Sequence, residues 1–115
     1  MTINQAIETI NAQKHNDLPV EEKVRWLSAL DGMAQTLIHG AGGDFGGYED
    51  APLSTQLIIP APFDDVYLYY LEAKIDYING DFTRFNNANA MFTDAWQRYA
   101  AHCLREKAGG KHQFF

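Results

Sequence analysis

The sequence is poor in the residues that most often form cross-links or bind metals. It has one cysteine, Cys103, in 115 residues, and a single cysteine cannot form a disulfide within the chain. Nothing therefore requires an oxidising compartment, and a cysteine-rich metal site is excluded. The four histidines, His15, His39, His102 and His112, have no mutual spacing typical of zinc ligands. We expect no metal site and no cofactor.

Positive charge and long apolar runs are also scarce. Fifteen acidic residues against nine basic ones give a formal charge of −6, which argues against a phosphate-binding surface as the main function, because such surfaces need clustered lysine and arginine. No window approaches the roughly 20 apolar residues that span a bilayer. The segment MTINQAIETI lacks the basic region and apolar run of a signal peptide. We expect a protein that folds in the cytoplasm and binds no membrane.

No catalytic signature is recognisable. The glycine cluster GAGGDFGG lacks the Lys-Ser/Thr pair and the preceding strand of a phosphate loop, and no Ser-His-Asp order is present. Lys74 lies among apolar residues, where a lysine with a lowered pKa can act as a base or nucleophile. No second catalytic group is spaced beside it, and an ion pair with Asp31 or with a neighbouring subunit is favoured. We expect no enzymatic activity.

What the sequence does have is enough apolar side chain for one core. Hydrophobic residues make up 46% of the chain and charged residues 21%, as in an ordinary globular protein. A chain of 115 residues can bury one modest core but not two. We therefore expect a single domain over residues 1–115.

Helical periodicity divides the first forty residues into two helices. Thr2 and Gln5 have the spacing of a capping box, and a helix of about three turns follows. A stronger helix begins near Asp17 or Leu18, with Pro19 in its first turn. Its predicted apolar stripe is Val20, Val24, Leu27, Leu30, Ala34 and Leu37, and its polar residues, Lys23 and Asp31 among them, are expected largely elsewhere.

The helical pattern disappears between His39 and Pro62. Five glycines fall within eight residues there, so we expect a long loop over residues 40–62, and loops longer than about 15 residues tend to be functional or mobile. The apolar run of Leu57, Ile58 and Ile59 fits an edge strand that a neighbouring chain extends. It also fits an apolar strap over the helices, which is the favoured interpretation.

A helical hairpin from Pro60 to Phe92 is the centre of the predicted fold. Its first helix runs from Phe63 to Ile78, and Asn79-Gly80 is a left-handed stop after which Asp81 caps the next helix. The wide apolar arc of this first helix suits burial on two sides. Its aliphatic stripe is Leu68, Leu71, Ile75 and Ile78, and its polar arc is Asp65, Tyr69, Glu72, Asp76 and Asn79.

The last helix is expected from Phe82 to about Lys107. Its C-terminal end has little to pack on within one chain, so we expect it to project, with Gly109-Gly110 releasing a tail. Its predicted apolar stripe is Phe85, Ala88, Phe92, Ala95, Trp96, Tyr99 and Cys103. The prediction is an all-α, four-helix bundle-like domain with a central hairpin, a long glycine-rich loop between the second and third helices, a long C-terminal helix and a flexible tail over residues 108–115.

Two stretches, EEKVRWLSALDG and LIIPAPFDDVYLYYLEAKIDYINGDFTRFNNANAMF, together with the helical opening, resemble the head-tail connector, or neck adaptor, proteins of tailed bacteriophages and prophages. The resemblance covers Ile3 to about Tyr99, and YYLEAKIDYINGD is its most specific part. The glycine-rich loop and the tail look variable. The resemblance implies a hairpin-based helical bundle that forms a ring beneath the portal, through which DNA passes towards the tail.

The expected role is therefore structural: a virion neck subunit that contacts portal protein, copies of itself and a downstream neck or tail-completion protein, with DNA passing but not bound by sequence. The alternative is a small cytosolic adaptor or regulator that binds a protein partner through an aromatic groove. Candidate subunit-interface residues are Tyr67, Tyr70, Lys74, Tyr77, Leu57, Ile58 and Ile59. Candidate partner-docking residues are Phe114 and Phe115, and candidate channel-facing residues are Asp65, Glu72 and Asp76.

Overall fold

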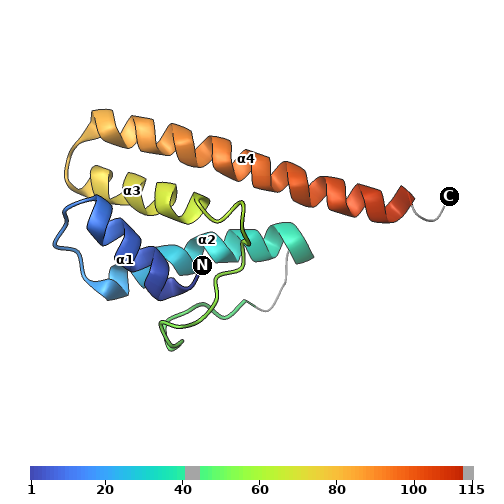
Figure 1. Ribbon diagram of the computed structural model, residues 1–115, viewed down its shortest axis with the longest axis horizontal. Helices are drawn as coiled ribbons and strands as arrows, with labels where there is room; N and C mark the ends of the chain where they lie inside the picture. Colours follow the sequence, from blue (N-terminus) through green and yellow to red (C-terminus); the bar gives the residue numbers. More distant parts are fainter. Residues whose placement is uncertain (41–44, 113–115) are drawn as a thin grey trace.

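The part of the chain that the structure describes folds into four helices, which are drawn in Figure 1. The computed structural model describes the backbone of residues 1–40 and 45–112 and the side chains of residues 1–40 and 45–107. The helices are α1 (Ile3–Gln13), α2 (Val20–His39), α3 (Val66–Ile78) and α4 (Phe82–His112). Within this described part no strand is present, and one isolated bridge joins Thr2 to Gln56. The predicted all-α class with four helices is confirmed.

The start of α1 is capped both locally and by the distant loop. The Thr2 hydroxyl accepts a hydrogen bond from the Gln5 N–H (3.1 Å), and the Gln5 side chain accepts one from the Thr2 N–H (2.8 Å), which confirms the capping box. The next free N–H groups, of Ile3 and Asn4, donate to the carbonyls of Thr55 and Leu53. Since these donors have no partner inside the helix, the loop completes the N-terminus of α1.

The helix α2 follows its predicted stripe only in part. Val24, Leu27, Leu30 and Ala34 are buried, whereas Val20 is 40% exposed. The expectation that Lys23 and Asp31 lie away from the core is wrong, because both are buried. Lys23 satisfies its ammonium on Asn11 Oδ1 (2.7 Å) and the Leu18 carbonyl (3.1 Å), and burial lowers the pKa of Lys23.

The hairpin of α3 and α4 is the most closely packed pair of helices (Figure 1). Gly80 has φ of 75°, a left-handed conformation that glycine adopts without strain, and Asp81 accepts a hydrogen bond from the Arg84 N–H (3.1 Å). The predicted stop and cap are therefore confirmed. The helix α4 then runs back along α3, passes the start of α3 and projects beyond the rest of the bundle, as expected (Figure 1).

Several predicted boundaries and faces in the hairpin are wrong. Residues 61–65 form turns, so α3 begins at Val66 instead of Phe63. In its aliphatic stripe Leu71 and Ile75 are buried, but Ile78, at the open end beside the turn, is 50% exposed. The helix α4 continues through Gly109-Gly110 to His112, so no tail is released there. Phe114 and Phe115 lie outside the described residues.

The loop crosses the bundle as a strap. Leu57 and Ile59 are buried against the helices, Ile58 is half-buried, and the Leu57 N–H donates to the Met1 carbonyl (2.9 Å). Because the segment makes a single bridge and no ladder, the edge-strand alternative is wrong and the strap interpretation is right. The loop does not require a glycine at position 32 of α2, because a Cβ there would make only an ordinary van der Waals contact, 3.7 Å from the Phe45 ring.

Candidate functional site

A buried carboxylate joins the strap to the bundle. Asp31 of α2 is 0% exposed, and its Oδ1 accepts a hydrogen bond from the Tyr67 hydroxyl of α3. Its Oδ2 accepts one from the Tyr48 hydroxyl and one from the Ile58 N–H (3.0 Å). The Tyr67 hydroxyl itself accepts from the Ile59 N–H (2.7 Å). This Asp31 cluster is closed to solvent, so it serves structure and not ligand binding.

Burial sets the ionisation of the Asp31 cluster. Desolvation raises the pKa of the Asp31 carboxyl above its ordinary value, although its three hydrogen bonds act in the opposite direction. Desolvation and the neighbouring carboxylate also raise the pKa of both tyrosines, Tyr48 and Tyr67. The two hydroxyls therefore remain protonated donors at neutral pH.

Lys74 does not reach Asp31. The described ion pairs do not include Lys74, and Asp31 is occupied by two tyrosines and the strap, so the predicted ion pair between them is wrong. The Lys74 ammonium lies 5.3 Å from the centroid of the Tyr70 ring, and its side chain is half-buried. Lysine commonly lies along aromatic surface in this way, and no second catalytic group is described beside it.

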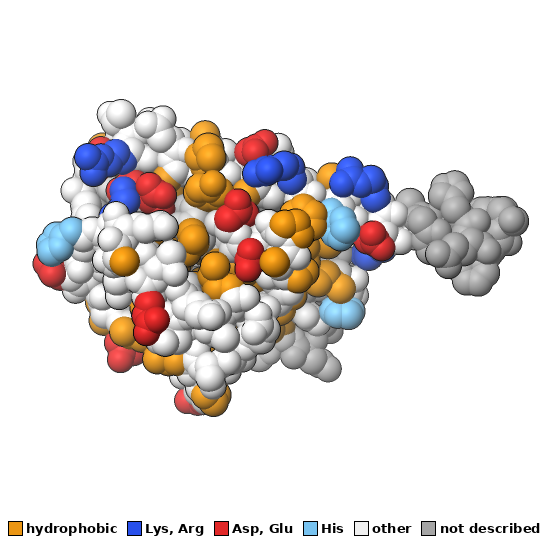
Figure 2. All heavy atoms as spheres, in the orientation of Figure 1, with side chains coloured by type: hydrophobic (Ala, Val, Ile, Leu, Met, Phe, Trp, Pro, Cys, Tyr) orange, Lys and Arg blue, Asp and Glu red, His pale blue; other side chains and the backbone are white. Residues whose placement is uncertain are grey.

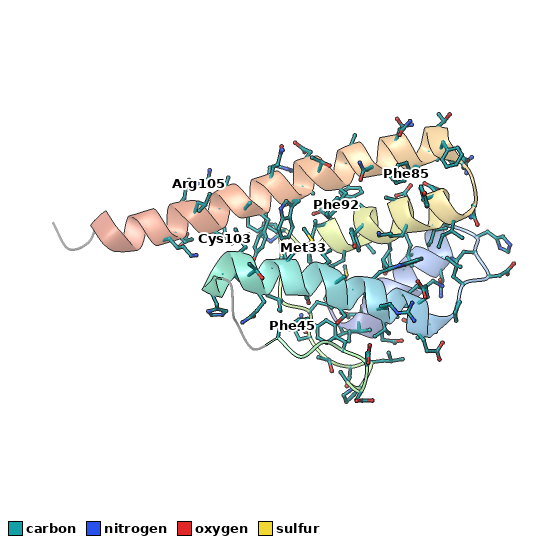
Figure 3. The ribbon with its side chains drawn as sticks, turned by 180° about the vertical axis from the view of Figure 1, so that it is seen from behind. Met33, Phe45, Phe85, Phe92, Cys103 and Arg105 are labelled. Carbon is teal, nitrogen blue, oxygen red and sulfur yellow. The ribbon has the colours of Figure 1, made fainter. Side chains whose placement is uncertain are left out.

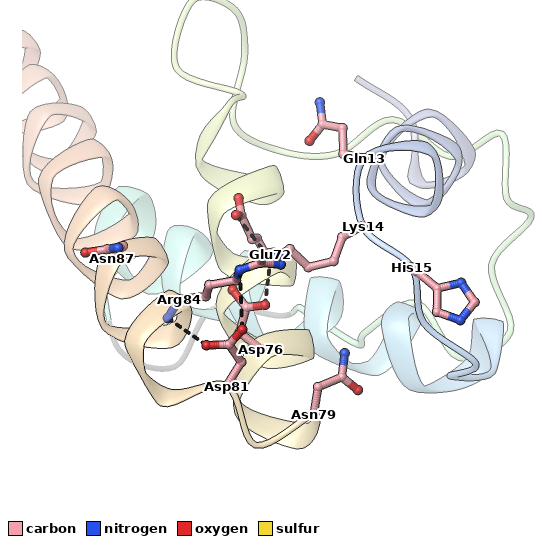
Figure 4. A pocket seen from close by; sticks show the side chains of 9 residues that line it. All are labelled: Gln13, Lys14, His15, Glu72, Asp76, Asn79, Asp81, Arg84 and Asn87. Atoms are coloured by element: carbon pink, nitrogen blue, oxygen red, sulfur yellow. Dashed lines mark hydrogen bonds and ion pairs between the residues drawn. The ribbon is translucent and has the colours of Figure 1, made fainter.

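A charged hollow of about 580 Å³ lies where the end of α1 meets the α3–α4 turn (Figure 4). Lys14, directly after α1, is 2.6 Å from Asp76 Oδ1 and 3.5 Å from Glu72 Oε1. Arg84 pairs with Asp81 at 3.3 Å. All nine lining side chains are polar, and three of them, Gln13, Asn79 and Asn87, are amides.

Asp76 is the unexpected member of this hollow. It is 2% exposed, and its Oδ2 atom is buried with no hydrogen-bond partner among the described residues. The prediction of a common solvated face for Asp65, Glu72 and Asp76 is therefore wrong: Asp76 is buried and the other two are half-buried. The reason is Lys14, which the connection after α1 brings across a separation of 62 residues.

Apolar side chains are exposed at the tip of the hairpin. Tyr77 is 60% exposed, Ile78 50% and Phe82 60%. The Tyr77 ring packs edge-on against Phe85, with centroids 5.4 Å apart, and Phe85 lies between α3 and α4 when the molecule is seen from behind (Figure 3). We call Tyr77, Ile78 and Phe82 the apolar tip. Exposed apolar groups that cluster in this way are typical of an interaction site.

A second apolar surface lies between α2 and α4. A hollow of about 540 Å³ is lined by Ala29, Met33 and Leu37 of α2 and by Trp96 of α4, and Met33 is 45% exposed. Figure 3 shows Met33 on the side of α2 that faces α4. On the opposite face of the molecule, Lys and Arg side chains lie next to Asp and Glu, with apolar groups between them (Figure 2).

The predicted interface residues divide into two groups. Tyr67, Leu57 and Ile59 lie in this chain's own core and have no surface to offer a neighbour, so the prediction is wrong for these three. Tyr70, Lys74 and Ile58 are half-buried and Tyr77 is exposed, and for them it stays a prediction.

The sequence did contain a signal for the missed cluster. Asp31 is four residues after Leu27 and seven after Val24, a spacing that places it on the buried face of α2. Lys23, four residues before Leu27, has the same relation to the core. A charged residue at such a position indicates a buried partner, but its spacing does not say which residue that partner is.

The described part of the chain contains no group of three or more His, Cys, Asp or Glu side chains that could hold a metal ion. None of its helices is long and apolar enough to cross a membrane. No protein-family model, curated protein or solved structure matches this chain. We therefore base the functional proposal on the geometry of the chain and on the expectation drawn from its sequence.

Proposed function

We propose that the protein is a non-enzymatic structural subunit of a phage or prophage neck, forming a ring between portal and tail that lets DNA pass. The observation that carries the proposal is the α3–α4 hairpin. The segment most similar to the neck adaptors, YYLEAKIDYINGD, covers most of α3 and the turn after it, and that same turn exposes the apolar tip. The resembling segment therefore contains Tyr77 and Ile78 of the apolar tip and ends directly before Phe82.

The mechanism is assembly. Burial of the apolar tip against another chain stabilises the assembly by roughly 25 cal/mol per Å² of apolar surface removed from water, and its residues Tyr77, Ile78 and Phe82 are exposed in the single chain. The projecting end of α4 offers further surface away from the core (Figure 1). The formal charge of −6 suits a channel through which DNA slides, because phosphate contacts with lysine and arginine are what hold DNA in place. The proposed contacts are portal protein, neighbouring copies and the next neck or tail-completion protein, within the virion.

The experiment is co-expression with the portal protein encoded in the same genome, followed by affinity capture of the portal. We expect the wild type to be largely monomeric alone and to co-purify with portal as a ring. The double variant Tyr77→Asp with Phe82→Asp is expected to lose this association while keeping its helical circular dichroism, since both residues are exposed. Absence of portal-bound wild type, or a genome without portal, capsid and terminase genes nearby, would contradict the proposal.

The hollow between α2 and α4 favours a second candidate, a small helical adaptor that binds a protein partner through an aromatic groove. Its residues, Met33 and Trp96 in particular, form an apolar surface separate from the apolar tip. Met33→Asp separates the two functions. If the protein is a neck subunit, the Met33→Asp variant should still associate with portal. If it is an adaptor, the variant should no longer bind its protein partner, and the wild type should not be incorporated into virions.

A further inference from the structure

The charged hollow contains a buried acceptor without a donor. Buried polar atoms in native proteins are almost always hydrogen-bonded, and each exception needs an explanation. The Asp76 Oδ2 atom is such an exception among the described residues, while its Oδ1 atom accepts from Lys14 at 2.6 Å. A carboxylate can accept several hydrogen bonds over its two oxygens. Asp76 is therefore half-satisfied by its own chain.

The hollow also has one carboxylate more than it has permanent cations. Glu72, Asp76 and Asp81 are its carboxylates, and Lys14 and Arg84 are its permanent cations, which pair with all three. Water in the hollow would leave the excess negative charge in place. A hollow of about 580 Å³ is also much larger than the roughly 30 Å³ that one water occupies. The hollow thus has the net negative charge and the room to accept a cation that donates hydrogen bonds.

We infer that this hollow binds a guanidinium group. Guanidinium is planar, always charged and carries five N–H donors with no acceptor, so it suits a site of carboxylate and amide oxygens. Asp76 Oδ2 has almost no exposed surface, so the guanidinium reaches Asp76 when the Lys14 ammonium, 2.6 Å from Oδ1, moves onto Glu72, from which it is 3.5 Å away. The amide oxygens of Asn79 and Asn87 are further acceptors in the hollow. The inference does not depend on the neck proposal.

The test is an NMR titration of the full-length, ¹⁵N-labelled protein with N-acetyl-L-arginine amide at constant ionic strength. The side-chain amide signals of Gln13, Asn79 and Asn87 report on the hollow directly. We expect saturable shifts at these groups with a millimolar dissociation constant. Methylguanidinium, tested alone, shows whether the guanidinium group suffices or whether a side-chain stem is also needed. The lysine analogue is expected to bind more weakly, because it lacks the planar donor array.

Matched variants connect the binding to the unpartnered carboxylate. Asp76→Asn keeps the shape and removes the charge, and we expect about tenfold weaker binding, the equivalent of about 1.4 kcal/mol. Asp65→Asn, which removes a carboxylate beside the start of α3 that does not line the hollow, is expected to bind like the wild type. If Asp76→Asn does not fold, Glu72→Gln replaces it, with a several-fold loss expected.

Four results would overturn the inference. The first is the absence of a saturable shift up to about 50 mM of the arginine probe, where even a weak site would be populated. The second is equally tight binding of the lysine analogue, and the third is unchanged binding of the arginine probe by Asp76→Asn or by Glu72→Gln. The fourth is a shift at the same side-chain amides when inorganic phosphate replaces the arginine probe. None of these results bears on portal association, so the neck proposal is tested separately.

Discussion

Tyr67→Phe tests whether the Asp31 cluster holds the strap to the bundle. The lost hydroxyl donates to a buried carboxylate, a bond of about 1.5–3 kcal/mol, and its loss also leaves the Ile59 N–H without an acceptor, at about 1–3 kcal/mol. Allowing for partial relaxation, we expect the free energy of unfolding to fall by about 3–4 kcal/mol. That is a large part of the roughly 5–15 kcal/mol that stabilises a typical domain.

The assay is urea unfolding followed by tryptophan fluorescence, since Trp26 is buried and Trp96 half-buried. With a slope of about 2 kcal/mol per molar urea, the midpoint should fall by roughly 1.5–2 M. Tyr48→Phe loses one donor to Asp31 Oδ2, which keeps the Ile58 N–H, so a smaller loss of about 1.5–2 kcal/mol is expected. Tyr77→Phe, at an exposed position, should change stability by less than about 0.5 kcal/mol.

The essential result is the order of the losses in stability, which should be largest for Tyr67→Phe, smaller for Tyr48→Phe and smallest for Tyr77→Phe. A Tyr67→Phe protein as stable as Tyr77→Phe would mean that the Asp31 cluster contributes little and that other contacts hold the strap to the helices. A change in how steeply the free energy of unfolding falls with urea concentration, together with a changed urea midpoint, would indicate that the strap detaches before the helices unfold.

Three single contacts lead to further predictions. Burial raises the pKa of Asp31 in the folded protein above its value of about 3.9 in the unfolded chain. The contribution of Asp31 protonation to folding stability is therefore present below that pH and is lost as the pH rises through the folded-state pKa. In paired urea titrations, the stability of the wild type relative to Asp31→Asn should be greater at pH 4 than at pH 7. Gly32→Ala should raise the thermal midpoint and stabilise the protein by about 0.5–1 kcal/mol, because the new Cβ meets nothing closer than 3.7 Å. Gly47→Ala should lower the midpoint and destabilise the protein by about 1–2 kcal/mol, because Gly47 has φ of 86° and its new Cβ would lie 2.9 Å from the Ser28 hydroxyl. Lys14→Met should cost about 3 kcal/mol in chemical denaturation because it leaves a buried carboxylate unpaired, and Arg98→Ala, from an exposed pair, should cost less than about 0.5 kcal/mol; equal effects would contradict the burial argument.

Local signals were sufficient to predict the four helices and some of their ends. The capping box at Thr2, the left-handed Gly80 and the cap at Asp81 each depend on residues within a few positions, and all three are observed. The apolar stripe of α4 was predicted from spacing alone, and within it Ala88, Ala95 and Tyr99 are buried. These features are local because short-range hydrogen bonds and one-sided burial determine them.

The candidate site was not predictable in the same way. The hydrogen bonds that define it join Asp31 to residues 17 and 36 positions away, and Lys14 to a residue 62 positions away. Periodicity placed Asp76 on a polar arc, which is correct for its side of α3, but that arc is covered by the connection after α1. Tyr67 was predicted as an interface residue because the width of an apolar arc does not tell whether a strap or a second chain covers it.

The most direct test of the central claim is an electron cryo-microscopy reconstruction of the tailed particle encoded with this protein. The neck proposal predicts a ring between portal and tail into whose density the α3–α4 hairpin and the projecting α4 can be built, with the apolar tip of Tyr77, Ile78 and Phe82 buried against another chain. A reconstruction whose neck is fully accounted for by other proteins, with this chain absent from the purified particle, would contradict it.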